Sequence, residues 1–295
     1  MLLVLVTVIW GSTFAVVKGV TAVVPPATLI GWRFTLGTLA LLPLLALPRR
    51  RTSAPSAAPR RSLWVDGLLL GVWLILGYGT QTLALAQTSA NRAAFFTALS
   101  VVLVPLWQAV AGRQPPGALL WSAVVLAVVG LALFSWEGGA LNRGDLWALG
   151  CAVSYAGFVL TLERTARDHP ALPYTLVQTL VVALLAWGWA LVAGTAGAAP
   201  RPVWGALIYL GIAATAVTTL LQTLGQRWVP AAQAAVIYAL EPVFAAVFSY
   251  FLLREVVGLR GLLGGALVVG ATILSQWPTG HPQPLTPHPE AEEGV

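Results

Sequence analysis

The most unusual of the residues that could do chemistry in this chain is Glu241, which lies in an apolar segment and is followed by Pro242. It is about ten residues into the segment 231–253, so at ~1.5 Å per residue its carboxylate lies ~15 Å from the segment's start. That depth is near the centre of a ~30 Å hydrocarbon layer, where an ionisable group is costly and indicates a functional site. Two roles are open. Glu241 binds a proton or a substrate ammonium group, or it is a structural carboxylate hydrogen-bonded to a neighbouring helix beside a proline kink.

Two basic side chains lie within other apolar segments. Arg33 is about seven residues into the segment 26–47, at a depth of ~10 Å. It could pair with a substrate carboxylate or with Glu241, or its long stem could carry the charge to the outer interface, and we favour the interior position. Lys18 lies near the outer end of the first segment, where anchoring at the interface is favoured over charge pairing.

Uncharged polar and aromatic side chains also lie at depth in the apolar segments. Such groups line a pathway or join helices by hydrogen bonds, and a tryptophan N–H at mid-span needs a partner. The residues predicted to bind substrate are Trp10, Ser12, Thr13, Tyr78, Gln81, Tyr155, Gln222, Tyr238 and Glu241.

The sequence offers little for catalysis or metal binding. The three histidines, His169, His281 and His288, all fall in loops or in the tail, and Cys151 is the single cysteine. No nucleotide-phosphate loop, metal-ligand cluster or nucleophile–base pair is present in the sequence, so we expect no catalytic residue, no metal and no cofactor. We therefore expect that the protein is not an enzyme.

The composition indicates an integral membrane protein. Hydrophobic residues make up 58% of the chain and charged residues 9%, with a mean hydropathy of +0.83, whereas about a quarter of residues are charged in soluble domains. Ten apolar segments can be counted, at approximately residues 2–23, 26–47, 63–86, 90–111, 117–135, 144–163, 171–193, 203–226, 231–253 and 258–276. The first has no basic start, which favours a retained span over a cleaved signal.

The net charge of +6 arises from arginines between the apolar segments, which set membrane orientation rather than bind nucleic acid. Five of them, Arg49, Arg50, Arg51, Arg60 and Arg61, follow the second segment and predict a cytoplasmic loop. With ten spans, both termini are then cytoplasmic. The tail 277–295 is rich in proline and acidic residues and is predicted to be a disordered cytoplasmic end.

The chain contains an internal repeat. A shift of 141 residues pairs Gln81-Thr82-Leu83 with Gln222-Thr223-Leu224, and Arg113 with Arg254. A five-span unit that is repeated once must be inverted the second time, as in many secondary transporters, whose sites lie near the midplane. The halves are residues 1–136 and 144–276. The first half has Ser100-Val101 where the second has Glu241-Pro242, so this element breaks the symmetry.

Four motifs in this order resemble a known family: W-G-S-T-F (Trp10 to Phe14), W-R-F (Trp32 to Phe34), T-S-A-N-R-A-A-F-F-T-A-L (Thr88 to Leu99) and A-L-E-P-V-F (Ala239 to Phe244). They resemble the EamA family of the drug/metabolite transporter superfamily over residues 1–276. The resemblance implies an all-α protein of ten transmembrane helices, arranged as two inverted five-helix repeats around a central cavity in the bacterial inner membrane.

The function implied by this resemblance is export or exchange of small organic metabolites, such as amino acids, by alternating access. The expected partners are a small-molecule substrate and the lipid bilayer, and one chain is expected to form a complete pathway, with the oligomeric state left open. The alternatives are a membrane-embedded enzyme acting on lipid-linked substrates, with Asp145, Glu137 and His169 as its candidates, or a channel, for which no repeated pore-lining charge is evident in the sequence.

Overall fold

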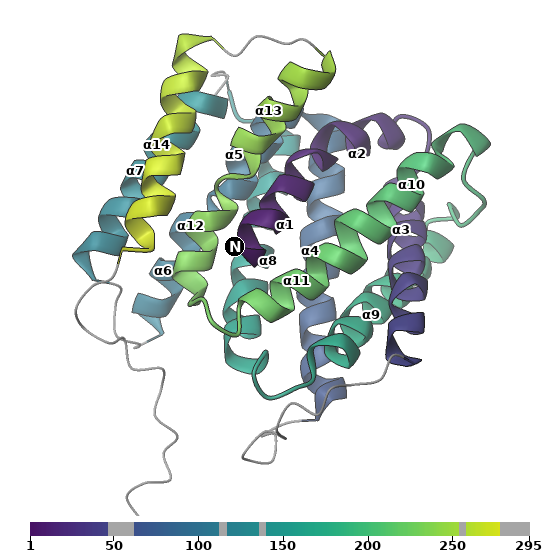
Figure 1. The fold of residues 1–295 in the computed structure, drawn as a ribbon. Helices are drawn as coiled ribbons and strands as arrows, with labels where there is room; N and C mark the ends of the chain where they lie inside the picture. Colours follow the sequence, from purple (N-terminus) through teal and green to yellow (C-terminus); the bar gives the residue numbers. More distant parts are fainter. Residues whose placement is uncertain (47–61, 112–116, 136–139, 254–257, 278–295) are drawn as a thin grey trace, which may run out of the picture.

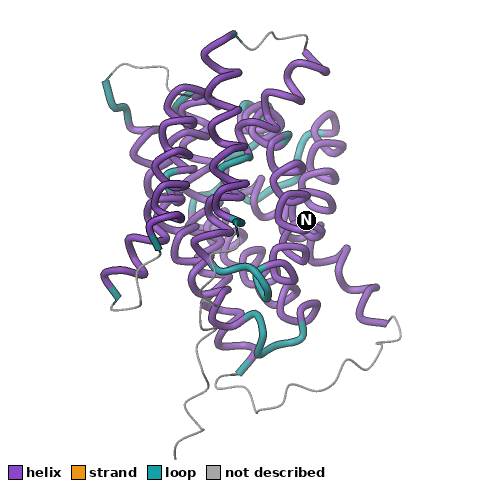
Figure 2. The backbone as a smooth tube through the Cα atoms, turned by 60° about the vertical axis from the view of Figure 1, so that its left-hand side comes forward, coloured by secondary structure: helices purple, strands orange, loops and turns teal. Residues whose placement is uncertain are grey.

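The computed structural model describes residues 1–46, 62–111, 117–135, 140–253 and 258–277. Within these ranges the chain is helical and contains no β-strand (Figures 1 and 2). Eight helical stretches are long and apolar enough to cross a membrane, and two shorter apolar helices, Ala118–Phe134 and Leu259–Ser275, occupy the two remaining predicted segments. The described part of the chain is therefore all-helical and is that of a membrane protein, as the composition predicts.

The helices of the two halves are as follows. Residues 1–135 contain α1 (Leu2–Gly11), α2 (Thr13–Thr21), α3 (Pro26–Leu41), the 3-10 helix η1 (Leu42–Ala46), α4 (Leu63–Gln87), α5 (Ala90–Ala98), α6 (Ser100–Val110) and α7 (Ala118–Ser135). Residues 140–277 contain α8 (Arg143–Thr165), α9 (Ala171–Val192), the 3-10 helix η2 (Arg201–Val203), α10 (Trp204–Gly211), the π-helix η3 (Ile212–Val217), α11 (Thr218–Gly225), α12 (Ala231–Tyr238), α13 (Glu241–Leu253) and α14 (Leu259–Ser275).

Local sequence explains where several helices begin. Ser62 caps α4 by accepting a hydrogen bond from the Trp64 N–H, and Asn142 and Asp145 form a capping box at the start of α8. Proline precedes α9 and α12, where its missing N–H costs nothing because the first helical turn leaves those donors unpaired. The predicted starts of these segments follow from these residues.

Several membrane-spanning stretches are interrupted near mid-span. The first is divided at Ser12, the stretch Ala90–Val110 is divided at Leu99, and the stretch that begins at Ala231 is divided between Tyr238 and Glu241. The stretch Arg201–Gly225 contains the π-helix η3. Residues next to three of these breaks, Thr13, Ser100 and Glu241, line the candidate site described below.

The helices pack as a bundle with a pair at one side. Helix α7 packs against α14 at the left of Figure 1, and α4 packs against both α8 and α9. Helix α3 packs against α9 and α10, while α1 packs against α11 and α13. Short α1 thus lies among helices of the second half, close to the residues of α12 and α13.

Two connections at one end of the bundle are tied together by hydrogen bonds to backbone carbonyls. Arg227 Nε donates to Ala166 O at 2.8 Å, Arg227 Nη2 donates to His169 O, and Arg167 Nε donates to Arg227 O at 2.5 Å. His169 Nε2 lies 2.8 Å from Asp66 Oδ2, and both residues are buried. These contacts, which we call the Arg227 junction, join the α8–α9 and α11–α12 connections to the start of α4.

Several predictions concern residues outside the described ranges. They include the arginine-rich loop at 49–61, Glu137, and His281 and His288 in the tail after residue 277.

Candidate functional site

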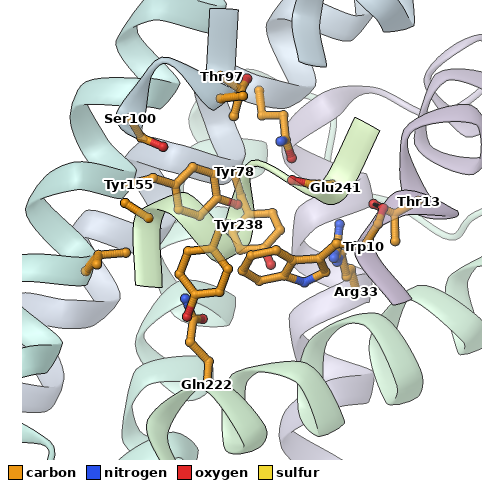
Figure 3. Close-up of a pocket in the computed structure, with 14 residues that line it drawn as sticks. Trp10, Thr13, Arg33, Tyr78, Thr97, Ser100, Tyr155, Gln222, Tyr238 and Glu241 are labelled. Atoms are coloured by element: carbon orange, nitrogen blue, oxygen red, sulfur yellow. Dashed lines mark hydrogen bonds between the residues drawn. The ribbon is translucent and has the colours of Figure 1, made fainter. Parts of the chain in front are cut away.

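A cavity lies among the helices at the centre of the bundle (Figure 3). Its walls come from both halves of the chain. The lining residues are Trp10, Thr13, Arg33, Tyr78, Gln81, Thr97, Ala98, Ser100, Tyr155, Val159, Gln222, Ala235, Tyr238 and Glu241.

Four aromatic rings form much of the wall. The Trp10 ring centroid lies 5.6 Å from that of Tyr238 and 6.2 Å from that of Tyr155, and the Tyr155 centroid lies 5.9 Å from that of Tyr78. Tilted and edge-to-face contacts at these separations are favourable. The rings therefore support one another and present a wall with apolar faces and polar edges.

Arg33 is 3% exposed, and its guanidinium group lies in the interior rather than at the end of α3. Its Nε donates to Thr215 Oγ1 at 2.7 Å and its Nη2 to Ala214 O at 2.8 Å, while Cζ lies 4.5 Å from the centre of the Tyr78 ring. A buried cation is tolerated only when hydrogen bonds and π-electrons replace its water. These three contacts supply that replacement and fix the plane of the group.

Glu241 begins α13 and points from there toward the tyrosine rings (Figure 3). It is half-buried, and none of the described residues forms a hydrogen bond or an ion pair with its carboxylate. A carboxylate at the N-terminus of a helix is stabilised by the helix dipole. Glu241 therefore offers a titratable carboxyl group to the cavity, and no described residue uses its hydrogen-bonding capacity.

Three further polar atoms of the lining are buried and lack a hydrogen-bond partner among the described residues: Trp10 Nε1, Thr97 Oγ1 and Gln222 Nε2. Leaving a buried donor unpaired costs ~1–3 kcal/mol. Such groups in a cavity wall are suited to a bound polar molecule or water, because binding removes that cost. Two of the three atoms are donors only, which favours a ligand with acceptor oxygens.

The structure brings together most residues that the sequence singled out. Trp10, Thr13, Tyr78, Gln81, Tyr155, Gln222, Tyr238, Glu241 and Arg33 all line the cavity. Ser12 and Lys18 are not among the lining residues. The Ser12 hydroxyl donates to Ile9 O at 2.7 Å and shares a short hydrogen bond with the Tyr209 hydroxyl, and Lys18 Nζ donates to Leu85 O and Thr88 O at 3.0 and 2.7 Å.

Five lining residues were not predicted: Thr97, Ala98, Ser100, Val159 and Ala235. The repeat contained the signal for two of them, because the shift of 141 residues pairs Thr97 with Tyr238 and Ser100 with Glu241. The other three are small or aliphatic residues in apolar helices, and their side chains carry no such signal.

Two of the three candidates for an enzymatic site lie in the described ranges, and both have structural partners. Asp145 accepts hydrogen bonds from Arg92 Nε at 3.0 Å, from Arg92 Nη2, and from the Asn142 N–H at 2.9 Å. His169 is bound to Asp66 in the Arg227 junction. Neither residue lines the cavity. Both carboxylate oxygens of Asp145 are engaged, so this residue ties α5 to the start of α8.

Comparison with known proteins gives the family. The EamA-like transporter family matches residues 1–136 and again residues 142–277. An uncharacterized transporter of Archaeoglobus fulgidus is 30% identical, over 92% of this chain and 83% of its own length. The uncharacterized transporter YwfM of Bacillus subtilis is 25% identical, over 83% of this chain and 91% of its own length. The uncharacterized inner membrane transporter YicL of Salmonella typhimurium is 24% identical, over 71% of this chain and 73% of its own length.

A solved crystal structure shares the fold, with a TM-score of 0.74 at 20% identity, covering 93% of this chain and 95% of that chain. The motifs that predicted the family lie where its two matches fall. The chain belongs to the EamA-like transporter family.

Proposed function

We propose that the protein is a secondary transporter that exports or exchanges small organic metabolites, such as amino acids, by alternating access. The observation that carries this proposal is the central cavity. Its lining includes Glu241, whose carboxylate has no hydrogen-bond partner among the described residues, and Arg33, which is held by Thr215 and Ala214. Relatives are named as transporters without a stated substrate, so the substrate class is argued from the cavity.

The polar groups of the cavity suit a ligand with charges of both signs. Arg33 can bind a carboxylate, and the Glu241 carboxylate can bind an ammonium group. The N–H groups of Trp10 and Gln222 can donate to further oxygen atoms, and the aromatic rings can cover an apolar side chain or stack on a cation. Small amino acids and related zwitterions combine these features.

The architecture that we propose is ten transmembrane helices in two inverted repeats, residues 1–136 and 144–276. Two observations support it. The family matches twice. Helix contacts also occur in related pairs: the contact of α4 with α8 corresponds to that of α11 with α1, and the contact of α4 with α9 corresponds to that of α10 with α3. The breaks at Leu99 and Leu240 are also related by the shift of 141 residues.

We further propose that the protein resides in a bacterial inner membrane with both termini cytoplasmic, which the arginines at 49–61 favour. We also propose that one chain forms a complete pathway, because residues from both halves of the chain line the cavity. No enzymatic step is proposed.

Transport of purified protein in liposomes tests this function. We expect saturable uptake of at least one member of a panel of amino acids and related zwitterions, and faster uptake when the same unlabelled compound is present inside. Such counterflow distinguishes a carrier from a channel. If uptake does not exceed that of empty liposomes for every compound, with and without a pH gradient, the proposed function is wrong.

A further inference from the structure

The π-helix η3, Ile212–Val217, lies in the middle of a 25-residue membrane-spanning stretch, Arg201–Gly225. A π-turn is wider than an α-turn and shifts the carbonyl groups away from their usual N–H partners, and such turns are frequent at functional sites. The segment I-A-A-T-A-V contains neither glycine nor proline that would impose an irregularity. Neither of these usual causes is present, and the segment is contacted by a side chain from another helix.

Those contacts come from Arg33. Its Nη2 donates to Ala214 O at 2.8 Å and its Nε donates to Thr215 Oγ1 at 2.7 Å, so both acceptors belong to η3. Ala214 and Thr215 are 0% exposed. The guanidinium group thus donates to a carbonyl and a hydroxyl that are shielded from water. The two hydrogen bonds satisfy these buried acceptors and two N–H groups of Arg33.

Close helix packing brings Arg33 to the π-turn. A Cβ atom built on Gly211 would lie 2.6 Å from Leu36 Cβ and 2.9 Å from Arg33 O, and one built on Gly37 would lie 3.0 Å from Gly211 O. Helices α3 and α10 therefore meet backbone to backbone. A Cβ atom at Gly211 would force them apart, and one at Gly37 would make a tight contact. The contact brings the root of the Arg33 side chain next to the start of η3.

The third side of the guanidinium group is covered by the Tyr78 ring, at 4.5 Å from Cζ. No described residue accepts a hydrogen bond from the remaining nitrogen, Nη1, and Arg33 lines the cavity. The guanidinium group is therefore held at the edge that carries Nε and Nη2 and at the face against Tyr78. The edge that carries Nη1 remains for a ligand. A rigid guanidinium group binds a carboxylate better than a mobile one, because less side-chain entropy is lost on binding.

We propose that Thr215 is a positioning residue: its hydroxyl, with the neighbouring Ala214 carbonyl of the π-turn, fixes Arg33 so that the free edge of the guanidinium group binds the carboxylate of the substrate. The substrate part of this inference rests on the proposed function, whereas the holding of Arg33 does not.

The first experiment measures whether Thr215 holds Arg33, and it needs no substrate. The purified protein is treated with phenylglyoxal, which modifies arginine, and the modification of Arg33 is followed by mass spectrometry. Thr215→Val removes the acceptor at nearly constant volume, and we expect Arg33 to react several-fold faster in it. Thr215→Ser retains the hydroxyl and should react at the wild-type rate.

A matched control comes from the same helix as Arg33. Thr38 is 7% exposed, and its Oγ1 has no hydrogen-bond partner among the described residues, so Thr38→Val should leave the rate unchanged. If Thr215→Val does not fold, Thr215→Ala replaces it. If Arg33 reacts in Thr215→Val, or in Thr215→Ala where that replaces it, at the wild-type rate, the positioning role is overturned, whatever the protein transports.

The second experiment measures the preference for a carboxylate in liposomes. The probes are L-leucine against 3-methylbutylamine and L-phenylalanine against 2-phenylethylamine, which differ by the carboxylate alone. In Thr215→Val we expect the half-saturating concentration of the amino acid to rise ~10-fold, the size expected for loss of one hydrogen bond to a charged group. The half-saturating concentration of the amine should not change. In Thr215→Ser the value for the amino acid should return to that of the wild type. Equal changes for acid and amine would overturn carboxylate recognition.

If no probe is transported, the proposed function loses support while the modification result still decides the positioning role.

Discussion

At the scale of single residues, Glu241 is the carboxylate of the cavity wall, and it lacks a hydrogen-bond partner among the described residues. A group in that state can exchange a proton or a cation without first breaking a bond within the protein. We predict that Glu241→Gln abolishes accumulation driven by a pH gradient but retains exchange of substrate, because glutamine keeps the shape and loses the titrating group. Paired uptake and counterflow measurements in liposomes test this.

Glu163→Gln is the control for that prediction. The Glu163 carboxylate accepts a hydrogen bond from the Ala231 N–H at 2.8 Å and does not line the cavity. Its variant should keep the pH dependence of the wild type. If Glu241→Gln also keeps that dependence, the carboxylate does not carry the coupled proton.

The residue scale also shows how far the sequence can place a site. Depth along a helix follows from counting residues, so the mid-span position of Trp10, Glu241 and their neighbours was predictable. Direction was not, because neighbouring residues point ~100° apart and an apolar helix surrounded by lipid and protein shows little periodicity. Thr13 therefore lines the cavity, whereas its neighbour Ser12 faces Tyr209.

At the scale of elements, α7 and α14 meet through glycine. A Cβ atom built on Gly264 would lie 2.6 Å from Gly130 O and 2.7 Å from Phe134 N, both of them backbone atoms that cannot rotate away. We predict that Gly264→Ala separates the pair and lowers stability by roughly 1–3 kcal/mol, the usual cost of overpacking. The apparent melting temperature in detergent measures this.

The same helix provides the comparison. A Cβ on Gly270 would lie 3.9 Å from Leu126 Cδ2, an ordinary contact, so Gly270→Ala should match or exceed the wild type because alanine favours the helix. Equal melting temperatures for Gly264→Ala and the wild type would show that the two helices are not in close contact. Helix existence was predictable here from apolar length. The π-turn of η3 was not, because its segment I-A-A-T-A-V contains no glycine or proline and the arginine that contacts it lies on another helix.

At the scale of the whole molecule, the apolar segments allowed an all-helical membrane protein to be predicted, and the four motifs allowed its family to be predicted. The ten-helix inverted repeat and the site at its centre stay predictions. Orientation depends on arginines in the loops. Cysteine labelling tests it, because the single native cysteine, Cys151, is 0% exposed and should not react.

We predict that Ala198→Cys, in the exposed α9–α10 connection, reacts with a membrane-impermeant maleimide from the outside of spheroplasts. Trp228→Cys, at a position that is 80% exposed, should react only after the membrane is opened. The opposite pattern would invert the proposed topology, and labelling of both from one side would refute the span count between them.

The Arg227 junction has a consequence for proteolysis. A protease that cleaves after arginine must take the guanidinium group into its specificity pocket. The Arg227 side chain is held by Ala166 O and His169 O, and the carbonyl of its own scissile bond accepts from Arg167. Cleavage between Arg227 and Trp228 therefore requires these connections to open first. Its rate would measure how often this end of the bundle unfolds locally, although the connection itself is short and reaches the surface.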